Sequence, residues 1–160
     1  SNPDRQEEVA RKEPRMGFAE AYPPLHSAEH LLTAVLCRRF PDIREYSSRL
    51  KSRKCVFEFH YAGTVTDVDI AEVEREVKAV IAADIAIEVC TILRAQAGDL
   101  PNLHQVPPDA ETVRVVRFGD ADERACIGHH VARTGEIVNF RITTLRQEQP
   151  GYWRINFSVD

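Results

Sequence analysis

Two segments repeat their hydrophobic positions with the period of an α-helix. Pro23-Pro24 precedes the first segment and Pro41 follows it, which predicts a helix from residue 23 to about residue 39. At roughly 100° per residue, one stripe of this helix is apolar and consists of Ala28, Leu31, Leu32 and Val35. A second helix is predicted from residue 69 to about residue 83, with Asp69 as its N-cap. Its buried face is expected to consist of Val73, Val77, Val80 and Ile81.

Alternating apolar and polar residues predict strands in the rest of the chain. The cleanest alternation places four residues on one face, Trp153, Ile155, Phe157 and Val159. This strand is predicted at 152–159. Further strands are predicted at 47–54, 55–61, 113–118 and 137–145, and the segment 85–93 is β-rich. A loop is expected at 97–110. Two helices and about six strands, grouped rather than strictly alternating, predict an α+β fold, a two-layer domain in which helices pack on a mostly antiparallel sheet.

The composition is that of one globular domain. The chain has 160 residues, of which 43% are hydrophobic and 29% charged. We expect the domain to comprise residues 16–160, because residues 1–15 are rich in charge and lack an apolar stripe, as in a flexible, solvated N-terminal tail. The most apolar stretch, 77–93, carries three charged residues, which exclude a membrane span. The four cysteines have no secreted-type spacing, so we expect reduced thiols and a cytoplasmic protein.

The first predicted helix carries a second, uncharged polar face opposite its apolar stripe. This face consists of His26, His30, Thr33 and Cys37. A helix on an open surface would present Lys or Glu there, so we expect this face to line a covered cleft. His26 and His30 lie about one helical turn apart, and both imidazoles can therefore reach one ion. Taken alone, the pair is weak evidence for a metal site and fits partly buried, hydrogen-bonded histidines better.

A second group of metal-binding residue types follows about 100 residues later, Cys126-x-Gly128-x-His130. Gly128 can adopt backbone angles that turn the side chains on either side in the same direction. By itself this segment also fits a packed cysteine with a histidine in a loop. Combined with His26 and His30, it supplies three nitrogens and one sulfur. That set of donors favours tetrahedral Zn²⁺ over Ca²⁺ or Mg²⁺.

Three short motifs resemble the editing domain of alanyl-tRNA synthetase. They are His26-x-x-x-His30-Leu31-Leu32, Cys126-x-Gly128-x-His130-Val131 and Thr134-Gly135-Glu136-Ile137. The free-standing AlaX relatives and the editing domain of threonyl-tRNA synthetase are similar. The resemblance runs from about residue 17 to the C-terminus and covers the editing core only, as in the short type of AlaX protein.

The resemblance implies a zinc-dependent hydrolase that cleaves the ester of a mischarged aminoacyl-tRNA in trans. The substrate it implies is typically seryl-tRNA(Ala) and sometimes glycyl-tRNA(Ala). The bound Zn²⁺ would orient the aminoacyl group and polarise its carbonyl. The four residues implied as its ligands are His26, His30, Cys126 and His130. The family usually has Thr at position 129, so we expect His129, like Thr33, to contact the substrate or to hydrogen-bond to a ligand.

Glu29 lies beside His30 on the predicted helix and is the candidate general base, although a solvated carboxylate or a salt-bridge partner fits the position equally well. His26-x-x-Glu29-His30 also matches an inverted zinc peptidase pattern with Glu29 as the base. That pattern takes its third ligand from a downstream Glu rather than from a Cys-x-Gly-x-His loop. A further alternative is a non-catalytic RNA-binding or interaction module in which zinc only joins the helix to the sheet, because four protein ligands fill a tetrahedron.

The overall charge does not indicate a nucleic-acid-binding protein. The formal net charge is −4 and the pI about 5.9, so any contact with tRNA must come from a local basic patch. The residues expected to form it are Arg49, Lys51, Arg53 and Lys54. The first three alternate, so a strand would project them to one face, where they could neutralise phosphates. The alternative is an edge strand that positive charge protects from pairing.

Overall fold

The computed structural model describes residues 20–160, so the predicted tail at 1–15 lies outside the described residues. Two α-helices are present in this part of the chain, α2 (Pro23–Arg39) and α3 (Asp67–Ala82). The first four strands are β1 (Arg44–Leu50), β2 (Lys54–His60), β3 (Glu88–Leu93) and β4 (Thr112–Phe118). The remaining strands are β5 (Asp122–Ala125), β6 (Arg141–Gln149) and β7 (Tyr152–Ser158).

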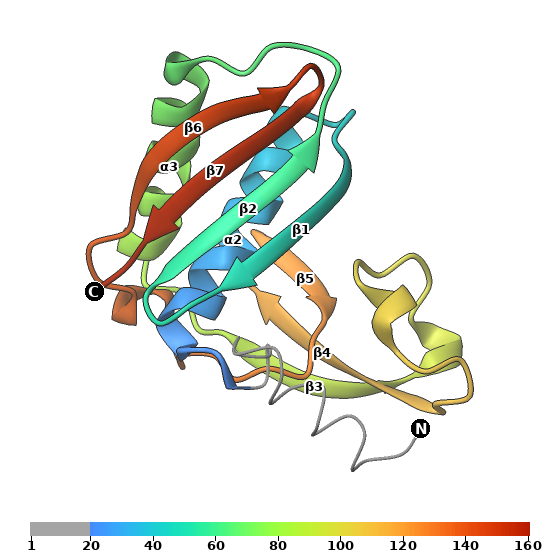
Figure 1. Ribbon diagram of the computed structural model, residues 1–160. Helices are drawn as coiled ribbons and strands as arrows, with labels where there is room; N and C mark the ends of the chain where they lie inside the picture. Colours follow the sequence, from blue (N-terminus) through green and yellow to red (C-terminus); the bar gives the residue numbers. More distant parts are fainter. Residues whose placement is uncertain (1–19) are drawn as a thin grey trace.

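The strands form two antiparallel sheets, which confirms the predicted α+β class. One sheet has four strands in the order β1-β2-β7-β6, and the other has three in the order β3-β4-β5. Both helices lie against the same face of the four-stranded sheet, and β5 of the smaller sheet contacts α2 from another side (Figure 1). Helix α2 therefore lies between the two sheets.

This position explains why α2 is buried on nearly every side. All twelve residues from Leu25 to Leu36 are buried, including the polar His26, His30 and Thr33. The uncharged polar face is thus covered, as the sequence predicts. The helix has Pro at its first positions, where the missing N–H costs no hydrogen bond, and it ends at Arg39 before Pro41.

Helix α3 begins earlier than the sequence predicts. Its N-cap is Thr66, and Asp69 is the third helical residue of a capping box rather than the cap itself. The Asp69 N–H donates to Thr66 Oγ1 at 3.2 Å, and the Thr66 N–H donates to Asp69 Oδ2 at 2.8 Å. This reciprocal pair satisfies two backbone donors, which is why the helix starts at Asp67. Of the predicted buried face, Val73 and Val77 are fully buried and the other two residues are half-buried.

The core below α2 comes from the alternating apolar residues of the central strands. Phe57 and Phe59 of β2 and Ile155 and Phe157 of β7 are completely buried. The two strands pair antiparallel with Phe57 opposite Ile155, which brings these side chains to the same face of the sheet. Within residues 20–160, no helix has the length and apolar character needed to cross a membrane.

Sequence patterning missed β5 completely. Three of its four residues are charged (Asp122, Glu123 and Arg124), and such a composition gives no strand signal. The strand nevertheless pairs with β4 from Val115 to Phe118 and is followed at once by Cys126. It therefore determines where the cysteine loop lies relative to α2.

Candidate metal centre

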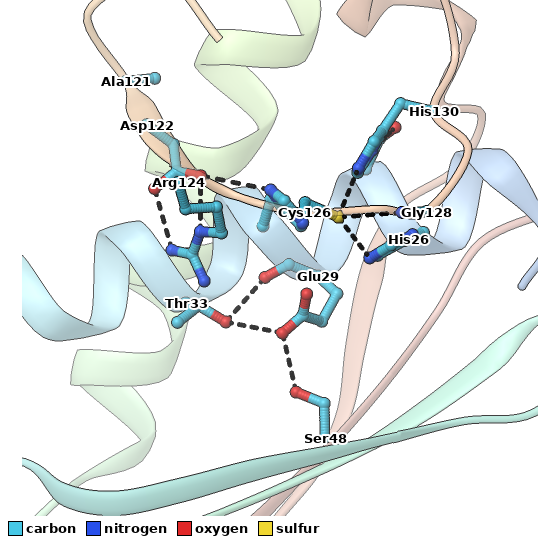
Figure 2. A network of polar contacts seen from close by, with 12 residues as sticks. His26, Glu29, Thr33, Ser48, Ala121, Asp122, Arg124, Cys126, Gly128 and His130 are labelled. Carbon is cyan, nitrogen blue, oxygen red and sulfur yellow. Dashed lines mark hydrogen bonds and ion pairs between the residues drawn. The ribbon is translucent and has the colours of Figure 1, made fainter. Parts of the chain in front are cut away.

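The structure brings the two predicted metal-binding motifs together. His26 and His30 extend from the first half of α2, while Cys126 and His130 come from the loop after β5. One potential ligand atom from each of the four residues lies within 4.8 Å of the other three. Figure 2 shows the imidazoles of His26 and His130 turned toward the Cys126 sulfur. This cluster can hold a metal ion.

The distances within the cluster match the size of a zinc site. Cys126 Sγ lies 3.6 Å from His26 Nε2 and 3.5 Å from His130 Nε2. At the usual bond lengths of about 2.3 Å for Zn–S and 2.0–2.1 Å for Zn–N, a tetrahedral angle separates sulfur and nitrogen by about 3.6 Å. The donor set and its spacing therefore fit Zn²⁺.

Hydrogen bonds fix the cysteine loop against α2. Ser27 Oγ accepts a hydrogen bond from the Val131 N–H at 3.2 Å and lies 2.9 Å from His130 Nδ1. With a proton on Nδ1, His130 donates to Ser27 and presents the lone pair of Nε2 to an ion. Arg114 of β4 supports the same loop, because its Nη1 donates to the carbonyl oxygens of Cys126 and Gly128 at 2.6 and 2.9 Å.

On the opposite side of the cluster, a buried ion pair supports His30. Arg124 donates to Asp122 through Nε at 2.8 Å and through Nη2 at 2.9 Å, and both side chains are about 95% buried. Asp122 Oδ2 also lies 3.3 Å from His30 Nδ1, a close ionic contact without the alignment of a hydrogen bond. The carboxylate thus favours a proton on Nδ1 of His30, which leaves Nε2 as the atom that can bind an ion.

The electrostatics of the cluster favour a thiolate. Burial alone would raise the pKa of Cys126, but hydrogen bonds from His130, His26 and His30 outweigh it and lower the pKa to about 3. Burial and the neighbouring histidines lower the pKa of His130 to about 4, against the opposing effect of Cys126. For His30, burial lowers the pKa, but Asp122 and Cys126 more than compensate, so its pKa lies above the usual value. A thiolate is the form of cysteine that binds metals.

Glu29 is buried beside the cluster rather than solvated. Its Oε2 accepts hydrogen bonds from Ser48 Oγ at 2.8 Å and from Thr33 Oγ1 at 3.1 Å. The Thr33 hydroxyl also lies 2.8 Å from the Glu29 carbonyl oxygen. Thr33 therefore contacts Glu29, and it does not line the cavity beside the cluster. Burial in this network excludes the alternative of a solvated helix carboxylate.

A small cavity opens beside these groups. It has a volume of about 80 Å³, room for only a few water molecules. Its walls include His26, His30 and Cys126 together with Glu29 and Arg124. The first three are potential metal ligands, Glu29 provides a carboxylate and Arg124 a guanidinium. This combination is suited to polarising a carbonyl group and hydrolysing its ester or amide bond.

Other predicted residues lie away from the cavity. His129 is exposed and does not line it. The predicted ladder of basic residues is wrong, because β1 ends at Leu50 and residues 51–53 form the turn to β2. Arg49 instead approaches Glu58 at 3.6 Å, and the Arg53 guanidinium lies 4.6 Å from the centre of the Tyr22 ring. Strand β1 is an edge strand, as the alternative interpretation requires.

The structure adds five supporting residues that motif reading did not find: Ser27, Ser48, Arg114, Asp122 and Arg124. The two serines carry no distinguishing pattern. The charged residues read as ordinary surface positions of strands or loops, and the unusual feature, the burial of the Asp122 and Arg124 side chains, appears only in three dimensions. No pattern in the sequence signals it.

The fold and this cluster define a small α+β domain with a candidate His₃Cys metal centre. Residues 113–156 match the model of the family described as the threonyl and alanyl tRNA synthetase second additional domain. The chain is 36% identical over 122 residues to the alanine–tRNA ligase of Idiomarina loihiensis, a match that covers 74% of this chain and 14% of that protein. It is 31% identical over 134 residues to the alanine–tRNA ligase of Mycoplasma pneumoniae, covering 81% of this chain and 15% of that protein.

The chain is thus related to the alanyl- and threonyl-tRNA synthetase editing-related family. It corresponds to only about 15% of the length of the curated relatives that it matches. The family match, 113–156, includes the cysteine loop and the strands that flank it, from β4 to most of β7.

Proposed function

We propose that this protein is a zinc-dependent hydrolase that deacylates a mischarged aminoacyl-tRNA in trans. The substrate we assign is seryl-tRNA(Ala), with glycyl-tRNA(Ala) as a second substrate, and the cytoplasm is the expected location. One observation carries the proposal: three imidazoles and a thiol from two distant segments have ligand atoms within 4.8 Å of one another beside a buried carboxylate. The relationship to a synthetase family supports tRNA as the partner.

In this proposal His26, His30, Cys126 and His130 hold Zn²⁺. When bound, the ion supplies Lewis acidity toward the carbonyl of the ester. The chain's own groups do the rest. The small volume of the cavity, about 80 Å³, accommodates a compact polar aminoacyl group and disfavours a bulky side chain, which supports serine or glycine as the residue removed.

Glu29 is the group we assign as general base. Ser48 and Thr33 both donate to Oε2, so the carboxylate is held at the cavity wall in one orientation. From there it can accept a proton from a water molecule that attacks the ester carbonyl, and the proton can then pass to the departing ribose oxygen. Arg124, on the cavity wall and held by Asp122, supplies positive charge near the oxygen that becomes negative.

The contact with tRNA is assigned to the basic residues of the β1–β2 hairpin, Arg49, Lys51, Arg53 and Lys54. These residues lie at strand ends and in the turn between them rather than along one strand, so their side chains would reach the RNA from several directions. Such contacts neutralise phosphates without reading the base sequence.

Deacylation assays with defined substrates test the proposal. Metal content and the rate of hydrolysis are measured on seryl-, glycyl- and alanyl-tRNA(Ala). The native chain is expected to hold about one Zn²⁺ and to prefer the first two substrates. His30→Ala is expected to lose metal and activity together. Glu29→Gln should keep the metal and lose most of kcat, because the amide cannot accept a proton.

Glu76→Gln is the matched control, since Glu76 is exposed on α3 and does not belong to the His/Cys cluster. This substitution should change neither the metal content nor kcat. Equal rates on seryl- and alanyl-tRNA(Ala) would refute the assigned specificity. Zinc binding without hydrolysis of any aminoacyl ester would favour the second candidate, a non-catalytic RNA-binding module. A specific observation supports that candidate: the cluster joins α2 to the loop after β5, and four protein ligands leave no open position on a tetrahedral ion.

A further inference from the structure

One face of the four-stranded sheet is covered by neither helix of residues 20–160. Both helices lie against its other face (Figure 1). Successive side chains of a strand point to opposite faces, and Phe57 and Phe59 are buried in the core on the helix side. Val56, Glu58 and His60 of β2 therefore point outward, to the open side that we call the outer face. Residues directly opposite one another on paired strands share a face, so the strand register assigns the other three strands as well.

The outer face is rich in basic side chains. The register places six of them there: Arg44 and Arg49 of β1, Lys54 of β2, Arg154 of β7, and Arg141 and Arg146 of β6. The chain as a whole has a net charge of −4, so this concentration of positive charge is a local feature. A surface that carries mostly one sign of charge attracts ligands of the opposite sign.

Half of these basic residues have no carboxylate partner within residues 20–160. The paired ones are Arg49 and Arg154, which both contact Glu58, Arg154 again with Glu148, and Arg141 with Asp160. Arg44, Lys54 and Arg146 form no such ion pair with a described residue. An unpaired cation keeps its charge available for a ligand, whereas a neighbouring carboxylate largely neutralises a paired one.

Strand β1 connects the outer face with the candidate metal centre. It is the edge strand of the four-stranded sheet. Tyr46, Ser47 and Ser48 of this strand line the small cavity beside the cluster. Arg44 and Arg49 of the same strand lie on the outer face. A molecule whose end occupies the cavity can therefore pass over the edge of β1 and extend along the outer face.

We propose that the outer face binds the phosphate backbone of the base-paired RNA stem that leads to the aminoacyl end of the substrate. This inference rests on the proposed function, because it takes the aminoacyl group to lie in the cavity beside the cluster. It goes further by placing the stem on the sheet face opposite the helices and not on the β1–β2 hairpin alone. Cations spread over an open surface neutralise successive phosphates without reading the bases, and double-stranded RNA is recognised mostly through its shape, its phosphates and its 2′-hydroxyl groups.

The character of the outer face favours RNA over an acidic protein. The centre of a protein–protein interface is typically apolar or aromatic. The exposed large hydrophobic side chains of residues 20–160 lie elsewhere, on α3, on β3, on the inner side of β1 and in the loops at Ile127 and Val138. The outer face instead has Thr144 opposite Asn156, and one side-chain oxygen of each is buried without a hydrogen-bond partner. A ribose 2′-hydroxyl can donate to such an acceptor, whereas a carboxylate cannot.

RNA binding by the zinc-loaded protein tests the proposal. Fluorescence anisotropy is measured with a labelled RNA hairpin that ends in a short single-stranded 3′ tail, over a range of salt concentrations. Arg44→Gln and Arg146→Gln together remove two unpaired charges. The double variant is expected to bind the hairpin about tenfold or more weakly, and the slope of log Kd against log salt concentration should become shallower by about 2, one for each lost phosphate contact.

Matched variants locate the effect on the outer face. Arg75→Gln removes the same charge from an exposed position of α3, on the helix side of the sheet, and should bind the hairpin like the parent. Arg146→Lys keeps the positive charge and should also retain binding, because a phosphate contact of this kind depends on charge. Zinc content and hydrolysis of serine methyl ester, which carries no RNA, report whether the double variant keeps its fold. On seryl-tRNA(Ala), the double variant should raise KM and leave kcat unchanged, since the outer face does not touch the ester.

The outcomes separate this proposal from the proposed function. Hairpin binding that the double variant weakens, without hydrolysis of any aminoacyl ester, supports the RNA site and contradicts the deacylase. Unchanged affinity and salt dependence in the double variant, with seryl-tRNA(Ala) still hydrolysed, overturn the RNA site and leave the deacylase standing. Polyglutamate that displaces the hairpin as effectively as unlabelled hairpin of equal charge would also overturn it, since the outer face would then bind any polyanion.

Discussion

The buried ion pair between Asp122 and Arg124 makes the strongest quantitative prediction. Replacing Arg124 by Met keeps the apolar bulk of the side chain and removes its charge. Both hydrogen bonds from the guanidinium to Asp122 are lost, and the carboxylate remains buried beside His30. A buried charge that loses its ion-pair partner is costly, because the interior of the protein does not replace the lost interaction in full.

The size of the effect follows from the geometry. Removal of one partner of a buried pair typically costs about 3–5 kcal/mol. Asp122 keeps one ionic contact, 3.3 Å from His30 Nδ1, so the expected loss is at the lower end, about 3 kcal/mol. For a chain of this length that corresponds to a fall in Tm of roughly 6–12 °C. Arg124 also holds the Asp122 carboxylate that orients His30. Its replacement should therefore lower the affinity for Zn²⁺ by about 10–100-fold.

A double-mutant cycle measures the pair. Unfolding free energies are determined by urea denaturation for the parent, Arg124→Met, Asp122→Leu and the double variant, all without metal. The double variant should be more stable than the sum of the single losses predicts, by about 2–3 kcal/mol, because no charge is then left buried. Arg117→Met, which breaks the exposed pair with Glu88, serves as the control and should leave stability unchanged.

The pH dependence gives an independent check on the same pair. Burial raises the pKa of Asp122, but the His30 and Arg124 contacts outweigh it and bring the pKa below its usual value. The stabilisation is therefore fully present above the unfolded pKa of about 3.9 and is lost as pH falls through the lower folded pKa. The deficit of Arg124→Met should shrink over that acidic range. A loss below about 1 kcal/mol at pH 7, or a strictly additive cycle, would show that the substitution does not leave a poorly compensated charge buried at Asp122.

Three further predictions concern the thiolate, the metal and a helix cap. In the metal-free protein at pH 6, iodoacetamide should modify Cys126 before the exposed Cys90, because the pKa of Cys126 is lowered to about 3. Added Zn²⁺ should protect Cys126 from modification. Peptide mass spectrometry measures the order of modification, and equal rates for the two cysteines would contradict the lowered pKa. Removal of Zn²⁺ by a chelator should lower Tm, since an ion that binds only the folded chain stabilises it by mass action, and calorimetry with and without metal tests this. Thr66→Ala should cost about 1 kcal/mol in unfolding free energy through loss of the capping box, with Thr64→Ala as a neutral control; equal stability of the two variants in urea denaturation would contradict a role of the capping box.

Local patterns in the sequence were sufficient for the elements that have their own periodicity. The bounds of α2 follow from Pro23 at its start and Pro41 after its end, and the alternation around Phe57 and Ile155 identifies two central strands. These signals work because helical and extended backbones repeat their side-chain directions at fixed intervals. The motif around His26 and the one around Cys126 are likewise readable, since each residue type carries its metal-binding chemistry with it.

The remaining features depend on which distant segments meet. Strand β5 has no apolar alternation, and it forms because β4 offers it a hydrogen-bonding edge. The turn after Leu50 is decided by the pairing of β1 with β2, so the alternation of Arg49, Lys51 and Arg53 did not continue as one strand. A pattern of alternating residues cannot say where a strand stops when polar residues occupy both faces.

The chemistry of the candidate site divides in the same way. The sequence alone determined which side chains are available for a metal centre and on which helix face two of them lie. Only the tertiary structure decided that Glu29 is buried, that Arg124 and Asp122 support His30, and that an apolar cavity adjoins Cys126. The physical reason is that burial and electrostatic coupling depend on distances between segments far apart in the chain, and these distances exist only after the two sheets have packed around α2.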